Sequence, residues 1–185
     1  MARLTNLRTS GFKKRLDPAD ICIYNTVVST RSGAIMDKPT NPSIDTIART
    51  CIAGRLRLLN RVVTGFYDDA LRPLGLRVSQ LNILIVTAKL GLARPAQVCE
   101  ILQLDTSTLS RNVKPLQAHG WLEVVPEEDG RAQPFRLTPK GSRLIEKAVP
   151  AWEEAQQQAV ELLGDEGIAL LNKAAKKLRV ETGDH

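Results

Sequence analysis

The chain has 185 residues, 43% of them hydrophobic and only 4% aromatic, so it can bury the aliphatic core of one domain. A formal net charge of +6 suits a polyanionic partner but does not identify one. Cys22, Cys51 and Cys99 are odd in number and far apart, which excludes a disulfide framework. The sequence starts without a secretory pattern, and no run reaches transmembrane length. We therefore expect a cytoplasmic protein without a membrane partner.

Residues 1–42 show no sustained hydrophobic period and are rich in Thr, Ser, Pro and basic groups, which predicts a flexible extension. From residue 43 to about 71 the pattern becomes helical. One apolar stripe of this helix consists of Ala48, Ile52, Leu56, Leu59, Val63, Phe66 and Ala70, and a second of Ile47, Cys51, Leu58 and Val62. Two apolar faces need two surfaces to bury against, which indicates either a second subunit or a further lobe.

The next three predicted helices are short. Pro73 and Gly75 end the first long helix, and Ser79 is the expected N-cap of a helix reaching about residue 89, with Gly91 as its stop. A helix over residues 95–103 begins with Pro95. Another covers residues 106–119 and ends at Gly120.

Two short alternating runs, residues 122–125 and 135–137, predict a hairpin around a polar loop. Thr138 and Pro139 then start a long helix that Pro150 should kink and Gly164 should stop, before Asp165 caps a last one. The predicted inward side chains of these two helices are Leu144, Ala148, Trp152, Ala155, Ala159, Leu162, Leu171, Ala174, Ala175 and Leu178. The order of elements is that of a helix-turn-helix followed by a wing.

The helix over residues 106–119 carries the strongest functional signal. Leu109, Val113 and Leu116 fall on one stripe, while Arg111 and Lys114 fall on the opposite side, which has no acidic residue. Arg can fork onto guanine, and Lys, Ser and Thr can contact bases or phosphates, so this face could read a major groove. An ordinary solvated face is the alternative. The predicted DNA-binding residues of this helix are Thr106, Ser107, Thr108, Ser110, Arg111 and Lys114.

The loop over residues 126–134 is the second candidate element. Gly130 permits a tight turn beside Asp129 and Arg131. An arginine at a hairpin tip can enter a narrow minor groove, so Arg131 is predicted to bind DNA and Asp129 to support the shape of the wing. A plain solvated turn is the alternative for this loop.

Three stretches resemble the multiple antibiotic resistance regulator (MarR) family: LRPLGLRVSQLNIL (71–84), LDTSTLSRNVKPLQAHGWLE (104–123) and DGRAQPFRLTPKG (129–141). The resemblance covers about residues 44–180. It implies a mainly α fold with a small β-hairpin wing, in which residues 79–138 form a winged helix-turn-helix. It further implies that residues 43–71 and 139–180 form a helical dimerisation lobe, followed by a short tail (181–185).

The resemblance also implies a function. A homodimer of this family would bind a near-palindromic double-stranded DNA operator, and as a repressor it would be released by a small aromatic or anionic effector. A peroxide-sensing branch of the family uses a cysteine of the first helix. Cys51 lies about two residues before that position and lacks a neighbouring tyrosine, so redox sensing through Cys51 is an alternative to ligand release.

Enzymatic chemistry is not predicted. His119 and His185 are the two histidines, and neither lies at metal-ligand spacing from a cysteine or carboxylate cluster. The sequence shows no glycine-rich phosphate loop or nucleophile elbow, so we expect no cofactor and no metal. The alternative from another class is a winged helix that binds protein, which would present exposed apolar groups on its recognition face.

Overall fold

The computed structural model describes residues 41–126 and 133–181 of the chain. The chain forms two compact units, residues 1–61 and residues 62–185, which are described separately below. The predicted flexible extension therefore lies almost entirely outside the described residues, as does the short C-terminal tail apart from its first residue.

The first long helix is two helices, so the prediction of one continuous helix over residues 43–71 is wrong at Cys51. α2 (Pro42–Thr50) begins at Asn41, whose side chain accepts from the Ser43 amide at 2.9 Å. Cys51 then has an extended backbone (ψ 107°), and α3 (Ile52–Leu71) follows. The hydroxyls of Thr46 and Thr50 donate to carbonyls four residues earlier, a bond that weakens and bends helices.

The apolar side chains around this junction are in solvent. α2 has no buried residue, although its polar and apolar side chains fall on different faces. The large exposed side chains of residues 41–61 are Ile44, Ile47, Ile52 and Leu56. Their exposure agrees with the expectation that this stretch needs a covering surface.

The second unit holds the hydrophobic core. After a 3-10 turn (Arg72–Leu74) come α4 (Val78–Leu90), α5 (Pro95–Leu102) and α6 (Thr106–Ala118). α4 contacts α5, α6, α7 and β2, which places it at the centre of the core. The aliphatic core predicted from the composition is confirmed by the buried cluster Leu71, Leu76, Leu81, Ile83, Leu84, Ala93, Val98, Leu109, Val113, Leu116, Trp121, Leu122, Phe135, Leu144 and Ala148.

α4 starts one residue before the predicted cap. Val78 is its first residue and Arg77 its N-cap, with the Arg77 amide donating to the Gln80 side chain at 3.0 Å. Ser79 was expected to cap the helix, but it lies within the first turn. The bond from the Arg77 amide to the Gln80 side chain is one of the two hydrogen bonds of a capping box, and it forms here without Ser, Thr, Asp or Asn at the N-cap.

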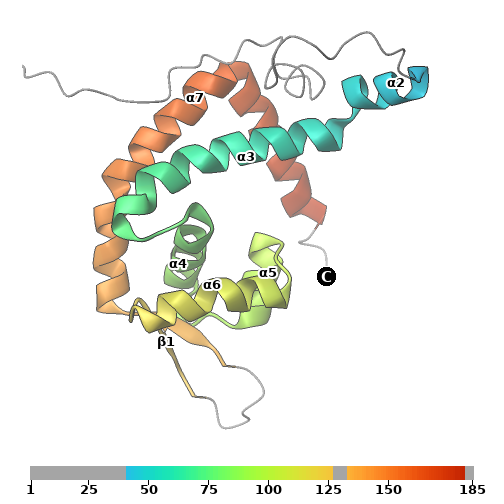
Figure 1. Ribbon diagram of the computed structural model, residues 1–185. Helices are drawn as coiled ribbons and strands as arrows, with labels where there is room; N and C mark the ends of the chain where they lie inside the picture. Colours follow the sequence, from blue (N-terminus) through green and yellow to red (C-terminus); the bar gives the residue numbers. More distant parts are fainter. Residues whose placement is uncertain (1–40, 127–132, 182–185) are drawn as a thin grey trace, which may run out of the picture. The chain divides into compact units, whose positions relative to one another are not determined.

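The predicted hairpin is present as β1 (Leu122–Val124) and β2 (Phe135–Leu137), an antiparallel pair beside α6 (Figure 1). Its register pairs Glu123 with Arg136. β2 also forms an isolated bridge with Ala93, whose amide donates to the Phe135 carbonyl at 2.9 Å. This bridge ties the wing to the connection between α4 and α5.

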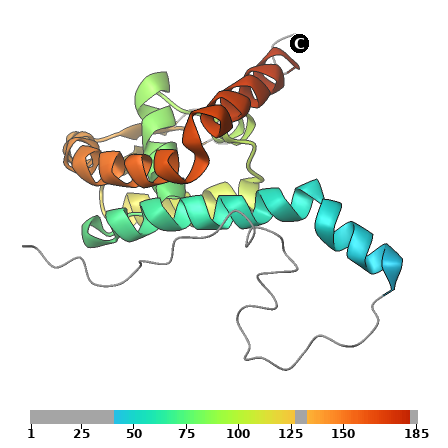
Figure 2. The same ribbon diagram turned by 90° about the horizontal axis from the view of Figure 1, so that it is seen from above.

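α7 (Pro139–Glu181) contains the two predicted C-terminal helices. Thr138 caps it by accepting from the Gly141 amide at 3.0 Å. Its helical dihedral angles are interrupted at Gly164 (φ 64°, ψ 171°), whereas Pro150 lies within the helix. Figure 2 shows the helix changing direction between its orange and red parts.

The predicted inward face of α7 is only partly buried. Ala148, Ala155 and Ala159 are buried, but Trp152 is 39% exposed. Beyond Gly164, Leu170 is 68% and Leu171 42% exposed, so the prediction that the last helix buries its apolar face is wrong for the single chain. Within the described residues of the single chain, no surface covers these side chains.

A close approach joins the start of α7 to the chain just before β1. Gly141 is buried, and a Cβ atom there would overlap the Trp121 carbonyl oxygen and lie 2.7 Å from Leu137 Cδ1. Thr138 Oγ1 also donates to the Gly120 carbonyl at 2.8 Å. A glycine at position 141 is therefore required for this contact.

We expect Gly141→Ala to lower the free energy of unfolding by about 1–3 kcal/mol, because the added methyl meets main-chain atoms that cannot rotate away. Gly65→Ala is the matched control, since Gly65 lies inside α3 with open space around its Cα. Alanine there should raise the free energy of unfolding by ~1 kcal/mol at most, because alanine has a higher helix propensity than glycine. Urea denaturation of both variants decides the point, and equal losses would show that the close approach is not responsible.

Candidate nucleic-acid interface

α6 is held to the core along one stripe. Leu109, Val113 and Leu116 are buried, Leu116 completely, as their spacing predicted. The opposite side is exposed and includes Arg111 and Lys114. Its other exposed residues are Thr106, Ser107, Ser110, Pro115 and Ala118. Thr108 is half-buried. Five of the six candidate residues predicted on this helix are therefore exposed and Thr108 is half-buried, and the residues of α6 include no acidic side chain.

Asp105 is the N-cap of α6, a role that was not predicted from the sequence. The Asp105 carboxylate accepts from the Thr108 amide at 2.8 Å, from Ser107 Oγ at 2.6 Å and from Thr108 Oγ1 at 2.7 Å. These hydrogen bonds, led by those from the Ser107 and Thr108 hydroxyls, hold the pKa of Asp105 well below its ordinary value. The carboxylate is therefore ionised at neutral pH.

Arg111 folds back onto the first turn. Its Nε donates to the Ser107 carbonyl at 3.3 Å, and its Nη2 donates to Thr108 Oγ1 at 3.0 Å. The positive charge also contributes, as the smallest cause, to the lowered pKa of Asp105. Arg111, Thr108 and Asp105 consequently form one hydrogen-bonded group at the start of the helix.

Asn112 connects α6 to α4. Its Nδ2 donates to the Thr108 carbonyl at 2.9 Å, and its Oδ1 accepts from Ser79 Oγ at 3.2 Å. Neither Ser79 nor Asn112 was predicted to have this role, because the partners are far apart in sequence. The Asp105 cap could have been found, since Asp directly before a helix is a strong N-cap signal.

The far end of α6 is held by the chain that follows the wing. Gly120 ends the helix as predicted, with a left-handed backbone (φ 69°). Lys140 Nζ donates to the His119 carbonyl at 2.8 Å, which places a cation at the helix C-terminus, where it is favourable. The His119 and Trp121 rings also pack together, with their centroids 4.4 Å apart.

The stem of the wing is described but its tip is not. Arg136 Nε donates to Glu123 Oε1 at 2.6 Å across the two strands. The Val125 amide donates to the Pro134 carbonyl at 2.8 Å, so the pairing continues toward the tip. Asp129 and Arg131 lie outside the described residues, and their predicted roles remain predictions.

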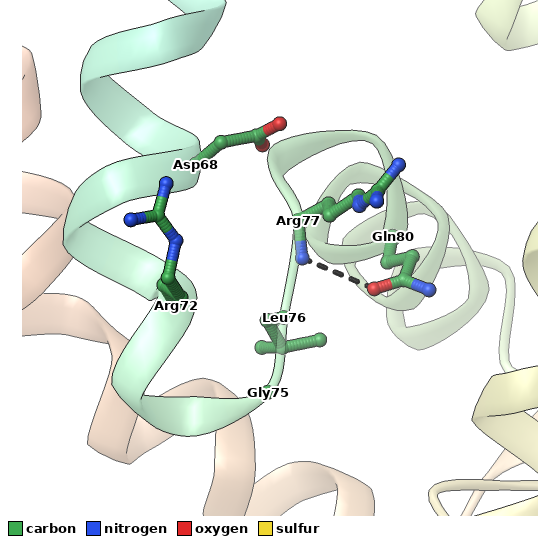
Figure 3. Close-up of a pocket in the computed structure, with 6 residues that line it drawn as sticks. All are labelled: Asp68, Arg72, Gly75, Leu76, Arg77 and Gln80. Atoms are coloured by element: carbon green, nitrogen blue, oxygen red, sulfur yellow. Dashed lines mark hydrogen bonds between the residues drawn. The ribbon is translucent and has the colours of Figure 1, made fainter.

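A cavity of about 530 Å³ lies between the end of α3 and the start of α4 (Figure 3). Asp68 Oδ1 accepts there from the Val78 amide at 2.8 Å, and Arg72 pairs with Asp69. The residues lining the cavity are Asp68, Arg72, Gly75, Leu76, Arg77 and Gln80. The guanidinium groups of Arg72 and Arg77 thus border a cavity beside α4, the helix whose Ser79 contacts α6.

Within residues 41–126 and 133–181, no group of three or more His, Cys, Asp or Glu side chains could hold a metal ion. No helix within the same residues is long and apolar enough to cross a membrane. Cys51 and Cys99 carry free thiols, and Cys51 lies at the junction between α2 and α3.

Comparison with known proteins gives a consistent result. Residues 74–132 match the model of the MarR family. The multiple antibiotic resistance protein MarR of Salmonella typhimurium is 28% identical over 129 residues, covering 68% of this chain and 89% of the relative. An uncharacterised HTH-type transcriptional regulator of Bacillus subtilis, YwoH, is 25% identical over 87 residues, covering 47% of this chain and 64% of the relative.

The solved structures that resemble the chain show the same fold. A mutant MarR from E. coli complexed with operator DNA has a TM-score of 0.62 at 20% identity, covering 76% of this chain and 99% of that one. CouR from Rhodococcus jostii RHA1 bound to p-coumaroyl-CoA has a TM-score of 0.59 at 22% identity, covering 73% of this chain and 94% of that one. With the matched segment, the buried stripe of α6 and the wing stem, these likenesses show a winged-helix fold like that of the MarR family, whose model matches residues 74–132.

Proposed function

We propose that this protein is a dimeric, sequence-specific DNA-binding repressor that a small-molecule effector releases from its operator. The observation that carries the proposal is the exposed face of α6. Arg111 and Lys114 lie on this face without an acidic neighbour from the helix, while the opposite stripe is fixed in the core. A helix presented in this way fits the major groove, where a positive face meets phosphates and base edges.

The composition of the face favours DNA over a protein partner. Its exposed side chains are cationic, hydroxyl-bearing or small, whereas a protein-binding face would present aromatic or large aliphatic groups. A mutant MarR from E. coli, which shares the fold, was solved in complex with operator DNA, and this supports DNA as the partner here. The wing would add Arg131, directed at the minor groove, with Asp129 supporting the loop.

Dimerisation is supported by apolar side chains that the single chain leaves exposed. They occur in α2 and the start of α3, and again in α7 beyond Gly164. Large exposed apolar groups on successive helices are typical of an interface. We propose that a second copy of the chain covers them, which would place two recognition helices on half-sites about one turn, or roughly 10 bp, apart.

The effector is proposed to be a small aromatic or anionic molecule. CouR, which shares the fold, was solved bound to p-coumaroyl-CoA, a small-molecule ligand. Release by oxidation of Cys51 is disfavoured, because Cys51 lies about two residues before the sensing position of the peroxide-sensing branch and lacks a neighbouring tyrosine.

Arg111→Ala should weaken binding to a selected operator about tenfold or more and relax the preference at one base position per half-site, because a bidentate contact to guanine is worth ~1–3 kcal/mol. Arg131→Ala should weaken binding to most sequences and lower the salt slope by about two per dimer, if each subunit loses one phosphate contact. Both are measured by binding isotherms at several salt concentrations, on a duplex that the wild type selects from a random pool. Wild-type behaviour of both variants would refute the proposed interface.

Leu170→Glu should dissociate or unfold the dimer, because the new charge would be buried against the second copy. Lys173→Glu, on the same exposed helix, should leave the dimer intact. Sedimentation equilibrium distinguishes the two variants. A wild type that sediments as a folded monomer would contradict the dimer, and a Leu170→Glu variant with wild-type association would remove Leu170 from its interface.

Cys51→Ser should bind the selected operator and be released from it as the wild type is, since oxidation is not the proposed signal. The measurement is a titration of each protein–DNA complex with a small panel of aromatic carboxylates, and separately with an organic hydroperoxide. Loss of peroxide release in the variant, together with peroxide release of the wild type, would favour the redox alternative.

A further inference from the structure

The way in which Arg111 is held determines which of its donors can face a base. A guanidinium has five N–H donors in a rigid planar fork. The Nε hydrogen and the neighbouring hydrogen of Nη2 form one edge, and here they donate to the Ser107 carbonyl and to Thr108 Oγ1 at 3.3 and 3.0 Å. The remaining hydrogens, two on Nη1 and one on Nη2, have no partner among the described residues. One hydrogen of Nη1 and the remaining hydrogen of Nη2 form the end-on edge of the fork.

The Thr108 hydroxyl is oriented by Asp105. A hydroxyl has one hydrogen to donate, and that of Thr108 goes to Asp105 Oδ2 at 2.7 Å. Its lone pairs therefore face Arg111 Nη2. The single hydroxyl hydrogen of Ser107 likewise goes to Asp105 Oδ1 at 2.6 Å. The hydrogen of each hydroxyl is thus donated within the protein, so neither hydroxyl can donate to a phosphate or to a base acceptor.

Resting on the proposed DNA-binding function, we propose that Asp105 and Thr108 are positioning residues that set the base specificity of Arg111. The carboxylate orients the Thr108 hydroxyl, which holds Nη2 while the Ser107 carbonyl holds Nε. The end-on Nη1–Nη2 edge of the guanidinium is left to fork onto guanine O6 and N7. Thr108 and Ser107 then act through Arg111 rather than by contacting DNA themselves. This assignment differs from the one that the sequence favoured, in which both were direct DNA contacts.

The Arg111 side chain needs little rearrangement when DNA binds. Because the Ser107 carbonyl and the Thr108 hydroxyl hold the guanidinium before DNA arrives, less rotamer freedom is lost when the contact forms. Lysine has no planar fork, so Arg111→Lys would keep the charge but lose the paired contact. The positive charge of Arg111→Lys should therefore preserve the salt dependence of binding, whereas the preference for guanine should be lost.

The test is a double-mutant cycle between Thr108 and Arg111, on the duplex selected by the wild type and on the same duplex with each candidate guanine replaced. Thr108→Val removes the hydroxyl but keeps the shape of the side chain and the amide bonded to Asp105. It should reduce discrimination at the guanine that Arg111 reads about threefold or more, the effect of one lost hydrogen bond. Thr108→Ser, which retains the hydroxyl, should restore wild-type discrimination.

The decisive measurement is Thr108→Val in the Arg111→Ala background. If Thr108 acts through Arg111, the second substitution should change neither affinity nor base preference further. An equal loss in both backgrounds would show that Thr108 contacts DNA directly and would overturn the proposal. A wild type that selects no duplex from the random pool would instead refute the proposed DNA-binding function, whereas Arg111→Ala with wild-type affinity and preference would remove Arg111 from the interface, so the failures are distinguishable.

Asp105→Asn tests the other half of the arrangement. The amide retains one oxygen to cap α6, but its NH2 group cannot accept from a hydroxyl. Discrimination at the same guanine should fall as for Thr108→Val, while the thermal midpoint shows whether the cap is kept. A variant with full discrimination would exclude Asp105 from the positioning role, and Arg111→Lys should keep the wild-type salt slope but lose the guanine preference.

Discussion

The candidate interface depends on the burial of one stripe of α6. Leu109, Val113 and Leu116 each lose nearly all of their contact with water, and burying an aliphatic side chain of this size contributes about 1.5–3 kcal/mol. A helix anchored on three such residues cannot rotate about its own axis without exposing them. Arg111 and Lys114 are therefore directed to solvent by the packing on the opposite side.

Polar contacts complete what this packing begins. The stripe fixes the rotation of α6, but it leaves both helix ends with unpaired backbone groups. The Asp105 carboxylate accepts from the Thr108 amide in the first turn, and Lys140 Nζ donates to the carbonyl of His119 at the C-terminal end of the helix. The close approach of Gly141 to Trp121 brings Lys140 into position for that bond. The same contacts therefore stabilise the helix and order its surface.

Outside the winged head, large apolar side chains of the described residues remain exposed to water. Ile52 is 70% exposed and Leu170 68% exposed, on helices whose sequences carry apolar stripes. A monomer would keep these side chains in water, which favours association. A second copy of the chain, as proposed, removes this surface from water and presents two reading heads together, so stability and recognition would arise from the same contact.

The sequence by itself determined the order of the elements, the buried stripe of α6, the hairpin, and the glycines that end helices at positions 91, 120 and 164. These follow from local rules, because the hydrophobic period and the turn residues act over a few neighbours. Only the tertiary structure decided which polar groups meet: Ser79 with Asn112 and Lys140 with His119 are far apart in the chain. Hydrophobic periodicity also did not record the break at Cys51, where the backbone becomes extended between two helices. The roles of Ser107 and Thr108 also changed, because residue type shows that a hydroxyl can bond to DNA, whereas only the fold shows that Asp105 already holds its hydrogen.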